Sequence, residues 1–220
     1  IGDSITCGYG VDDPDKEHHF KTATEDVTKA YAYKTALALN ADYSMVSVSG
    51  YGIISGFTND GNKIPEQTIP QYYDKLGFSY NKFADSITVS ETEWDFERYK
   101  PDIIVINLGT NDMNYATTDE RKAEFEDGYL DFLKKVRSLN PDSYIFQTYG
   151  VMGTSLEENI ENVRRKYMSE TGDERITFIP LTMQDEYADG IVADWHPSPR
   201  THSLVSQKVT AAIKETLGYK

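Results

Sequence analysis

The chain has 220 residues, of which 39% are hydrophobic and 12% aromatic, so it can bury the core of one domain and disorder is excluded. Its 22 lysines and arginines against 36 aspartates and glutamates give a net charge of −14, which argues against nucleic acid or an anionic membrane surface as a partner and favours neutral substrates. No apolar run approaches the roughly 18 residues of a transmembrane helix, and the single cysteine, Cys7, excludes an intrachain disulfide and a thiolate metal site.

The first ten residues place Ser4 in a glycine-rich stretch. Glycine, aspartate and serine dominate turns, so an ordinary turn is one interpretation of this stretch. The functional interpretation is a strand that ends at Ile1, followed by a turn that presents the Ser4 hydroxyl at the rim of a sheet, where glycines let another molecule approach closely. Cys7 is a rival nucleophile, although a lone cysteine is more often a small buried hydrophobe.

A polar loop over residues 11–20 follows, and it carries three aspartates and the adjacent His18 and His19. These groups could bind a cation, but the two histidines lack the i, i+4 spacing that aims both at one metal from a helix. A solvated loop is therefore the favoured interpretation, and we expect neither a metal nor another cofactor.

From residue 24 onward the chain alternates between predicted helices and predicted strands. The run over 102–108 is nearly all apolar, which is typical of a parallel strand covered on both faces. Capping residues and apolar periodicity predict helices over 24 or 25–40, 117–139, 155–171 and 198–217. Strands are predicted over 43–48, 102–108, 143–151 and 175–181. This alternation predicts a parallel sheet with helices on both faces, in one domain that spans residues 1–220.

The segment 55–80 interrupts this alternation, because prolines and an Asn-Asp-Gly-Asn turn signal break it. Its tyrosines Tyr72, Tyr73 and Tyr80 could line a sugar-binding wall or pack over the core, and the sequence does not separate these interpretations. Trp94, which follows the segment, is assigned to the core.

Functional residues of open parallel sheets gather at the carboxyl ends of the strands. Acyl transfer by serine needs a hydroxyl, a base, a group that orients the base, and donors for the developing oxyanion. Ser4 is the candidate hydroxyl, and His196 is the candidate base, since an unperturbed pKa of about 6.5 suits work near neutrality. Asp194 can reach the imidazole if its loop is extended, because residues i and i+2 then point to one face. The backbone N–H groups of Ser4 and Gly50 and the side-chain amide of Asn111 are the candidate oxyanion donors.

Each candidate also has a purely structural interpretation. His202, His18 or His19 could be the base instead, and His196 is preferred for its carboxylate neighbour and the Pro-Ser-Pro stop beside it. Asn111 could simply occupy a left-handed backbone position. The co-occurrence of these residues after successive predicted strands favours the catalytic interpretation.

Four motifs, in this order along nearly the whole chain, resemble the blocks of the SGNH (GDSL-type) hydrolase superfamily. They are Gly2-Asp3-Ser4, Gly50, Gly109-x-Asn111-Asp112 and Asp194-x-His196. The longer wordings Gly-Asp-Ser-Ile-Thr-Cys-Gly-Tyr-Gly and Asp-Trp-His-Pro-Ser resemble carbohydrate esterase family 2.

The superfamily resemblance implies an α/β fold, a three-layer α/β/α sandwich with a mostly parallel, flavodoxin-like sheet of five strands, the first largely upstream of residue 1. It implies Ser4 as nucleophile, His196 as base, and an oxyanion hole formed by Ser4, Gly50 and Asn111. The superfamily places the orienting aspartate three residues before the histidine, where this chain has Ala193. Either the Asp194 carboxylate or a backbone carbonyl could therefore orient His196.

The resemblance to carbohydrate esterase family 2 implies removal of O-acetyl groups from plant cell-wall carbohydrates such as xylan and glucomannan, through an acyl-enzyme and without a cofactor. It implies an acetylated saccharide as partner rather than nucleic acid or membrane, a β-sandwich domain upstream, and an extracellular location. A lipolytic or thioester-cleaving relative is the alternative enzyme, although the polar 55–80 segment argues against its long apolar trough. A carbohydrate-binding relative without turnover is the alternative of another class.

Overall fold

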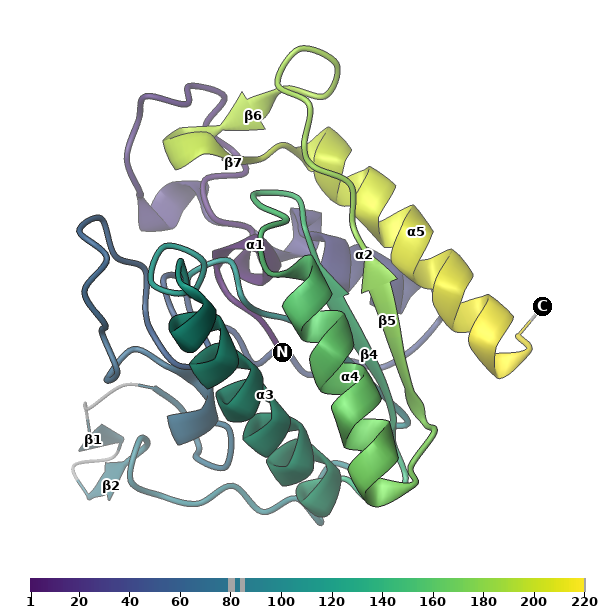
Figure 1. Cartoon of the computed structure of the whole chain (residues 1–220). Coiled ribbons are helices and arrows are strands. Elements are labelled where there is room, and N and C mark those ends of the chain that lie inside the picture. The colour runs from purple at the N-terminus through teal and green to yellow at the C-terminus, as the bar shows by residue number, and fades with distance from the viewer. Residues whose placement is uncertain (79–81, 84–85, 220) are drawn as a thin grey trace.

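A parallel sheet of three strands forms the centre of the molecule (Figure 1). The computed structural model describes residues 1–78, 82–83 and 86–219. The strands are β3 (Ile103–Asn107), β4 (Tyr144–Tyr149) and β5 (Ile176–Pro180), in the order β3-β4-β5. Ile104 pairs with Ile145, which pairs with Ile176, so apolar side chains form a continuous row across the sheet.

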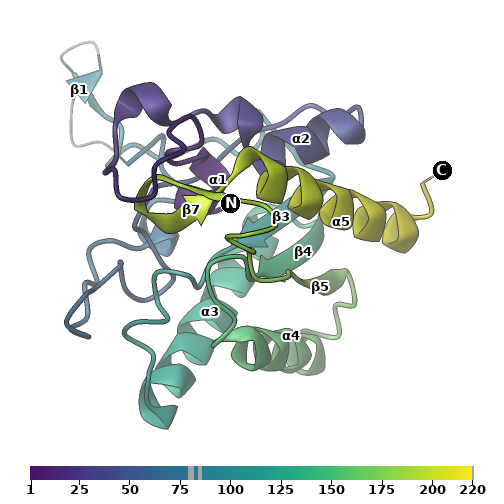
Figure 2. The same cartoon turned by 90° about the horizontal axis from the view of Figure 1, so that it is seen from above.

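Helices cover both faces of this sheet, so the architecture has the three layers that the alternation predicted (Figure 2). The four long helices are α2 (Tyr31–Ala38), α3 (Asp119–Leu139), α4 (Glu157–Thr171) and α5 (Pro199–Leu217). On one face α3 packs against α4, and on the other α2 packs against α5. Successive strand residues divide between the two cores, since Ile145 lies in the core with α3 and α4 and Phe146 in the core with α2 and α5.

Shorter elements complete the described part of the chain. Two small antiparallel sheets pair β1 (Lys82–Phe83) with β2 (Ile87–Thr88) and β6 (Ile191–Val192) with β7 (His196–Pro197). The short helices are α1 (Ser4–Cys7) and 3₁₀ turns over Thr22–Thr24, Val27–Lys29, Ile69–Gln71 and Ala193–Trp195. Within the described ranges, none of the helices has the length and apolar character that crossing a membrane requires.

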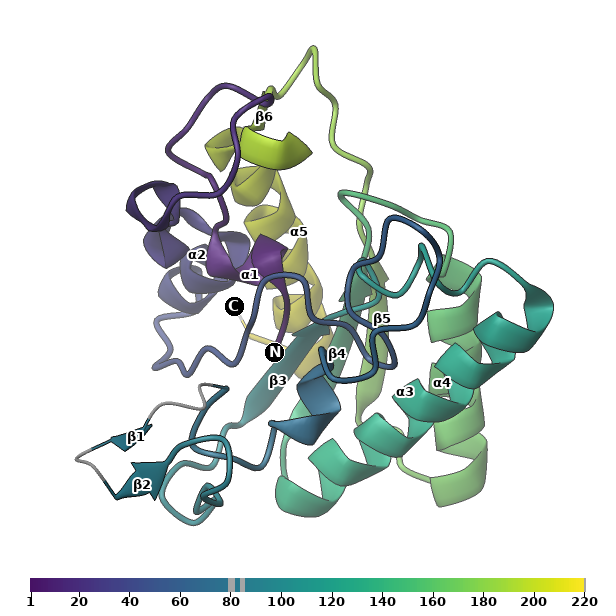
Figure 3. The ribbon, with the colours of Figure 1, turned by 90° about the vertical axis from the view of Figure 1, so that its left-hand side faces the viewer.

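Of the five parallel strands that the resemblance implied, three form the parallel sheet of the described residues. Gly2 forms single parallel bridges to Ser47 and to Asn107, and its N–H donates to the Val46 carbonyl at 2.9 Å. A strand needs consecutive paired residues, and the predicted strand 43–48 forms a single bridge to Gly2, in which the Val46 carbonyl accepts and the Val48 N–H donates. The start of the chain lies beside β3 and leads into α1 (Figure 3). The expectation of a strand and a further domain upstream of residue 1 stays a prediction.

Helix ends differ from the predictions where tertiary contacts compete with local propensity. The helix predicted from residue 24 or 25 begins only at Tyr31, because the Asp26 N–H donates to the Gly8 carbonyl at 3.1 Å and its carboxylate accepts from the Thr28 N–H at 2.9 Å. The predicted caps of α5 are confirmed: the Ser198 hydroxyl accepts from the Thr201 N–H at 3.2 Å.

The tyrosines of the 55–80 segment pack over the core where the structure describes them. Tyr72 and Tyr73 are buried, and the Tyr73 ring packs edge-on against Phe132 of α3 at 5.5 Å. Tyr80 lies outside the described residues. Trp94 is half-buried and lines a cavity of about 330 Å³, which lies beside Ile1 between β3 and residues 41–46.

Candidate active site

Ser4 is the first residue of α1, and the residues before it form the turn that presents it. The Asp3 carboxylate caps this helix by accepting the Ile5 N–H at 3.0 Å. Only glycine fits at position 2, since a Cβ there would lie 2.0 Å from the Thr6 hydroxyl oxygen. The helix ends at Gly8, whose φ of 77° is left-handed. Each residue of the Gly-Asp-Ser motif therefore has a local role. The glycine permits the tight turn before the helix, the aspartate caps the helix, and the serine supplies the buried hydroxyl.

His196, 192 residues further along the chain, meets Ser4 through the small β6-β7 sheet, and its Nε2 lies 2.9 Å from the Ser4 Oγ. Its Nδ1 lies 3.0 Å from the Asp194 carbonyl oxygen and 3.2 Å from that of Ala193. Carbonyl oxygens only accept, so Nδ1 carries the proton and Nε2 accepts from the serine. Burial lowers the pKa of His196 to about 4, against the opposing effect of the two carbonyls and the Asp194 charge. The imidazole is therefore neutral and able to act as a base at neutral pH.

The prediction that the Asp194 carboxylate contacts His196 was wrong. The carboxylate accepts instead from the Tyr9 hydroxyl at 2.5 Å, from His19 Nδ1 at 2.8 Å and from the Phe20 N–H at 3.1 Å. The loop is not extended: it forms a 3₁₀ turn in which Asp194 has φ 49° and Trp195 φ 58°. Residues i and i+2 then no longer point to one face, and the backbone-carbonyl alternative describes the observed contacts.

The three candidate oxyanion donors lie at one place. The Asn111 amide donates one N–H to the carbonyl oxygen of Tyr51, next to Gly50, at 2.8 Å and the other to the carboxylate of Asp3, next to Ser4, at 3.3 Å. In the described part of the chain, neither the Ser4 N–H nor the Gly50 N–H has a hydrogen-bond acceptor. Unpaired backbone donors beside a serine hydroxyl are what an oxyanion requires.

A family model, the GDSL-like Lipase/Acylhydrolase family, matches residues 1–204. The chain belongs to this family. The four motifs and their order along the sequence had predicted this membership.

Among curated relatives, this GDSL-like chain is 34% identical over 228 residues to the cellulase/esterase CelE of Acetivibrio thermocellus, covering 100% of this chain and 25% of CelE. It is 26% identical over 225 residues to an acetylxylan esterase / glucomannan deacetylase of Cellvibrio japonicus, covering 100% of this chain and 56% of that protein. The chain thus spans about a quarter to about half the length of these relatives.

The solved structures that resemble this chain include esterases as well. A family two carbohydrate esterase from Clostridium thermocellum, in complex with cellohexaose, matches with a TM-score of 0.85 at 34% identity, covering 100% of this chain and 64% of that chain. An acetyl xylan esterase from the rumen bacterium Butyrivibrio proteoclasticus matches with a TM-score of 0.91 at 26% identity, with the same two coverages of 100% and 64%. The α/β SGNH-like fold is therefore shared with carbohydrate esterases of family 2.

The other histidines and the cysteine of this GDSL-like domain have structural partners. His202 is buried on α5, where its Nδ1 accepts the Tyr31 N–H at 3.2 Å. His18 Nδ1 lies 2.9 Å from an Asp13 carboxylate oxygen. Burial raises the pKa of the Cys7 thiol, which donates to the Ser47 hydroxyl at 3.3 Å, so it stays protonated. These contacts favour His196 over the other candidate bases and Ser4 over Cys7.

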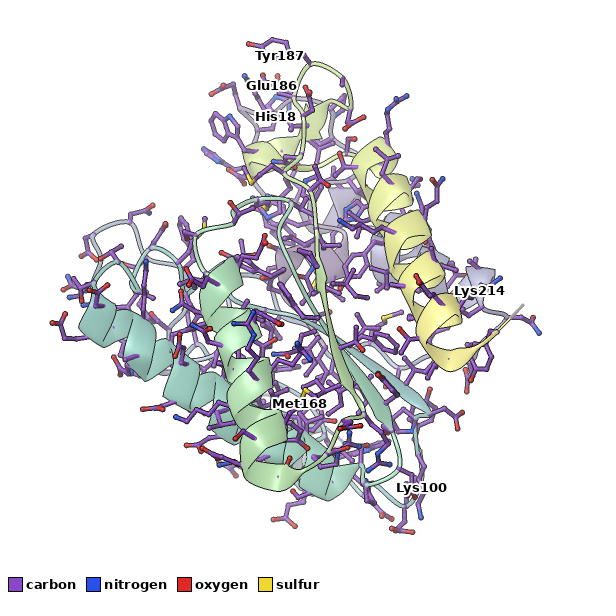
Figure 4. All side chains as sticks on the ribbon, turned by 45° about the vertical axis from the view of Figure 1, so that its right-hand side comes forward. His18, Lys100, Met168, Glu186, Tyr187 and Lys214 are labelled. Carbon is purple, nitrogen blue, oxygen red and sulfur yellow. The ribbon has the colours of Figure 1, made fainter. Side chains whose placement is uncertain are left out.

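The polar loop 11–20 lies beside the turn that precedes His196, where the Asp194 N–H donates to the His18 carbonyl at 3.0 Å. It lies against the loop before β6, where Lys16 Nζ is 2.5 Å from Glu186 Oε1. His18, Glu186 and Tyr187 gather at that end of the molecule, opposite Lys100 and Met168 (Figure 4). Across residues 1–78, 82–83 and 86–219, no cluster of three His, Cys, Asp or Glu side chains could hold a metal ion.

Two supporting residues were missed from the sequence. Asp112, considered only as part of a motif, accepts the N–H groups of Ile53, Ile54 and Ser55 at 2.9, 2.8 and 3.1 Å and so fixes the loop that follows Gly50. Its burial raises the pKa of Asp112 to about 6, an effect that these hydrogen bonds oppose. Tyr9 stacks on the His196 ring with centroids 3.9 Å apart. Its place between two glycines, five residues after Ser4, was the only signal for it.

Proposed function

We propose that this domain is a serine esterase that removes O-acetyl groups from plant cell-wall carbohydrates. The observation that carries the proposal is the 2.9 Å contact between Ser4 Oγ and a His196 whose Nδ1 proton is held by carbonyl oxygens. The names of the relatives, an acetylxylan esterase / glucomannan deacetylase among them, support the substrate class.

In the proposed first step, Ser4 Oγ attacks the acetyl carbonyl carbon while its proton passes to His196 Nε2. The carbonyl oxygen becomes an oxyanion that accepts from the Ser4 N–H, the Gly50 N–H and the Asn111 amide. The C–O bond to the sugar then breaks, and His196 returns the proton to the departing sugar hydroxyl.

In the second step His196 takes a proton from water, whose oxygen attacks the acetyl-Ser4 carbonyl. Breaking the bond to Ser4 Oγ releases acetic acid and returns the proton from His196 to the serine. In both steps the imidazole becomes positively charged for a moment, and the carbonyl oxygens of Ala193 and Asp194 at Nδ1 stabilise that charge.

The surroundings of the site favour a saccharide over a long acyl chain. Trp195, directly before His196, and Phe57, whose N–H donates to the Gly50 carbonyl at 2.8 Å, are both about half exposed. Exposed aromatic faces beside a polar site suit the apolar faces of sugar rings. The apolar cavity of about 330 Å³ beside Ile1 has no site residue in its lining, so it offers no trough to an acyl chain at Ser4.

Acetate release from acetylated xylan, glucomannan and cello-oligosaccharides, measured beside esters of longer acyl chains, tests this proposal. The expected result is turnover of the acetylated saccharides that Ser4→Ala abolishes. Faster turnover of long-chain esters would favour the lipolytic alternative. Saccharide binding without any acetate release would favour a binding module.

A further inference from the structure

The Asp194 carboxylate reaches the His196 imidazole only through a third side chain. The Tyr9 hydroxyl donates to Asp194 Oδ2 at 2.5 Å, and the Tyr9 ring lies nearly parallel to the imidazole, with an interplanar angle of 20° and centroids 3.9 Å apart. The Phe20 ring packs against Tyr9 with centroids 4.9 Å apart. Tyr9 is therefore held by contacts with two rings and by a hydrogen bond from its hydroxyl.

We propose that Tyr9 is a positioning residue for His196 and that Asp194 supports the imidazole through Tyr9, an inference that rests on the proposed esterase function. In a triad the carboxylate hydrogen-bonds the imidazole directly. Here the Nδ1 side is taken by backbone carbonyls, and the carboxylate holds the aromatic ring that covers the face of the imidazole.

The stack can act on the imidazole in two ways. A ring held parallel at 3.9 Å restricts rotation of the imidazole about its side-chain bonds, which keeps Nε2 at the serine oxygen. The electron-rich ring face also favours a cation above it, and the imidazole becomes cationic only during the reaction. Donation of the Tyr9 hydroxyl to a carboxylate increases the electron density of that ring face. The charge of Asp194 therefore helps to stabilise the imidazolium through the Tyr9 ring.

The same carboxylate holds the turn that supplies the two carbonyls. Left-handed φ values, 49° at Asp194 and 58° at Trp195, are uncommon outside glycine, although aspartate adopts them more readily than tryptophan. The turn is held by the Asp194 N–H, which donates to the His18 carbonyl at 3.0 Å, and by the bonds from Tyr9 and the Phe20 N–H to the carboxylate. Tyr9 and Asp194 therefore form one unit with two contacts on His196: the ring on its face and the backbone at Nδ1.

The test compares Tyr9→Phe, Tyr9→Leu, Asp194→Asn and the double variant Tyr9→Phe with Asp194→Asn, by kcat and KM on a small soluble acetyl ester. A control is Tyr167→Phe, which removes another tyrosine–carboxylate bond, to Asp173 at 3.0 Å, at the far end of α4. An aromatic pair contributes about 0.5–1.5 kcal/mol, so Tyr9→Leu should lower kcat about two- to tenfold with KM changed less than twofold.

Tyr9→Phe, which keeps the stack, should recover most of the loss in Tyr9→Leu. The residual loss in Tyr9→Phe should not multiply with that in Asp194→Asn, because both remove the same bond. Tyr167→Phe should lower the melting temperature without changing kcat. A wild-type kcat in Tyr9→Leu, or losses that multiply in the double variant, would overturn the inference. Ser4→Ala, assayed on the same ester, tests the proposed function separately, since a failure of Ser4 dependence refutes the esterase mechanism itself.

Discussion

Replacing Asn111 with alanine removes the side-chain donor of the proposed oxyanion hole. In the free protein this amide donates to the Tyr51 carbonyl at 2.8 Å, and Asn111 is only 5% exposed. The side chain is thus already held beside Gly50 before any substrate binds. The second N–H of the amide donates to the Asp3 carboxylate at 3.3 Å, so an oxyanion would take the place of this longer bond while the bond to Tyr51 keeps the side chain in position.

The expected magnitude follows from this arrangement. Loss of one oxyanion donor costs about 2.7–4 kcal/mol of transition-state stabilisation, or roughly a hundred- to a thousandfold in kcat. The ground-state ester oxygen carries little charge, so KM should change by no more than about threefold. Loss of the bond to Tyr51 should also lower the free energy of unfolding by about 1 kcal/mol.

The assay is steady-state hydrolysis of a small acetyl ester by Asn111→Ala, with Asn114→Ala as the matched control. Asn114 also donates its amide to a backbone carbonyl, that of Thr58 at 3.0 Å, so its loss should affect stability in a similar way. Only Asn111→Ala should lose kcat. An unchanged kcat with a raised KM would refute the oxyanion role and assign Asn111 to substrate binding.

Three further predictions concern the charges around the site. Asp194→Asn should lower kcat on the same ester about two- to tenfold, because the carboxylate does not touch His196. Replacement of a triad carboxylate would lower kcat by roughly 10⁴. A loss near 10⁴ would therefore contradict the observed contacts. Since burial lowers the pKa of His196 to about 4, the pH profile of kcat/KM should stay level from pH 7 to about 5 and fall only as pH drops through about 4; a midpoint near 6.5 would contradict this. Burial raises the pKa of Asp3 from 3.8 to about 7, so between these pH values the unfolded chain ionises while the folded state keeps its proton, and stability falls as pH rises. Asp3→Asn should therefore raise the melting temperature more at pH 8 than at pH 4, and an equal change at both would refute this.

Local sequence patterns predicted the elements whose determinants are local. The apolar run over 102–108 is typical of a covered parallel strand, and β3 is one. Ser198, Pro199 and Gly218 mark the two ends of α5 by capping geometry alone. The pairing of Ser4 with His196 was predicted because each residue lies in a motif of the superfamily, although the two are 192 residues apart.

Features that depend on contacts between residues far apart in the chain could not be predicted from the sequence. The helix expected from residue 24 or 25 is cut short because the Asp26 N–H bonds to Gly8 instead of continuing a helix. The direction of the Asp194 carboxylate depends on the left-handed φ values of Asp194 and Trp195. Neither residue type predicts such a backbone conformation at its position. The Tyr9 stack likewise joins segments that only the folded sheet brings together.

Acetate release from an acetylated xylo-oligosaccharide by Ser4→Ala tests the proposal that Ser4 is the nucleophile of an acetyl esterase. Ser4 is buried, but its replacement by alanine removes only the hydroxyl oxygen, so the variant should fold with an unchanged circular dichroism spectrum. We expect its acetate release to fall to the background rate while saccharide binding persists. A folded Ser4→Ala protein that releases acetate near the wild-type rate would contradict the account and make Cys7 the nucleophile to test.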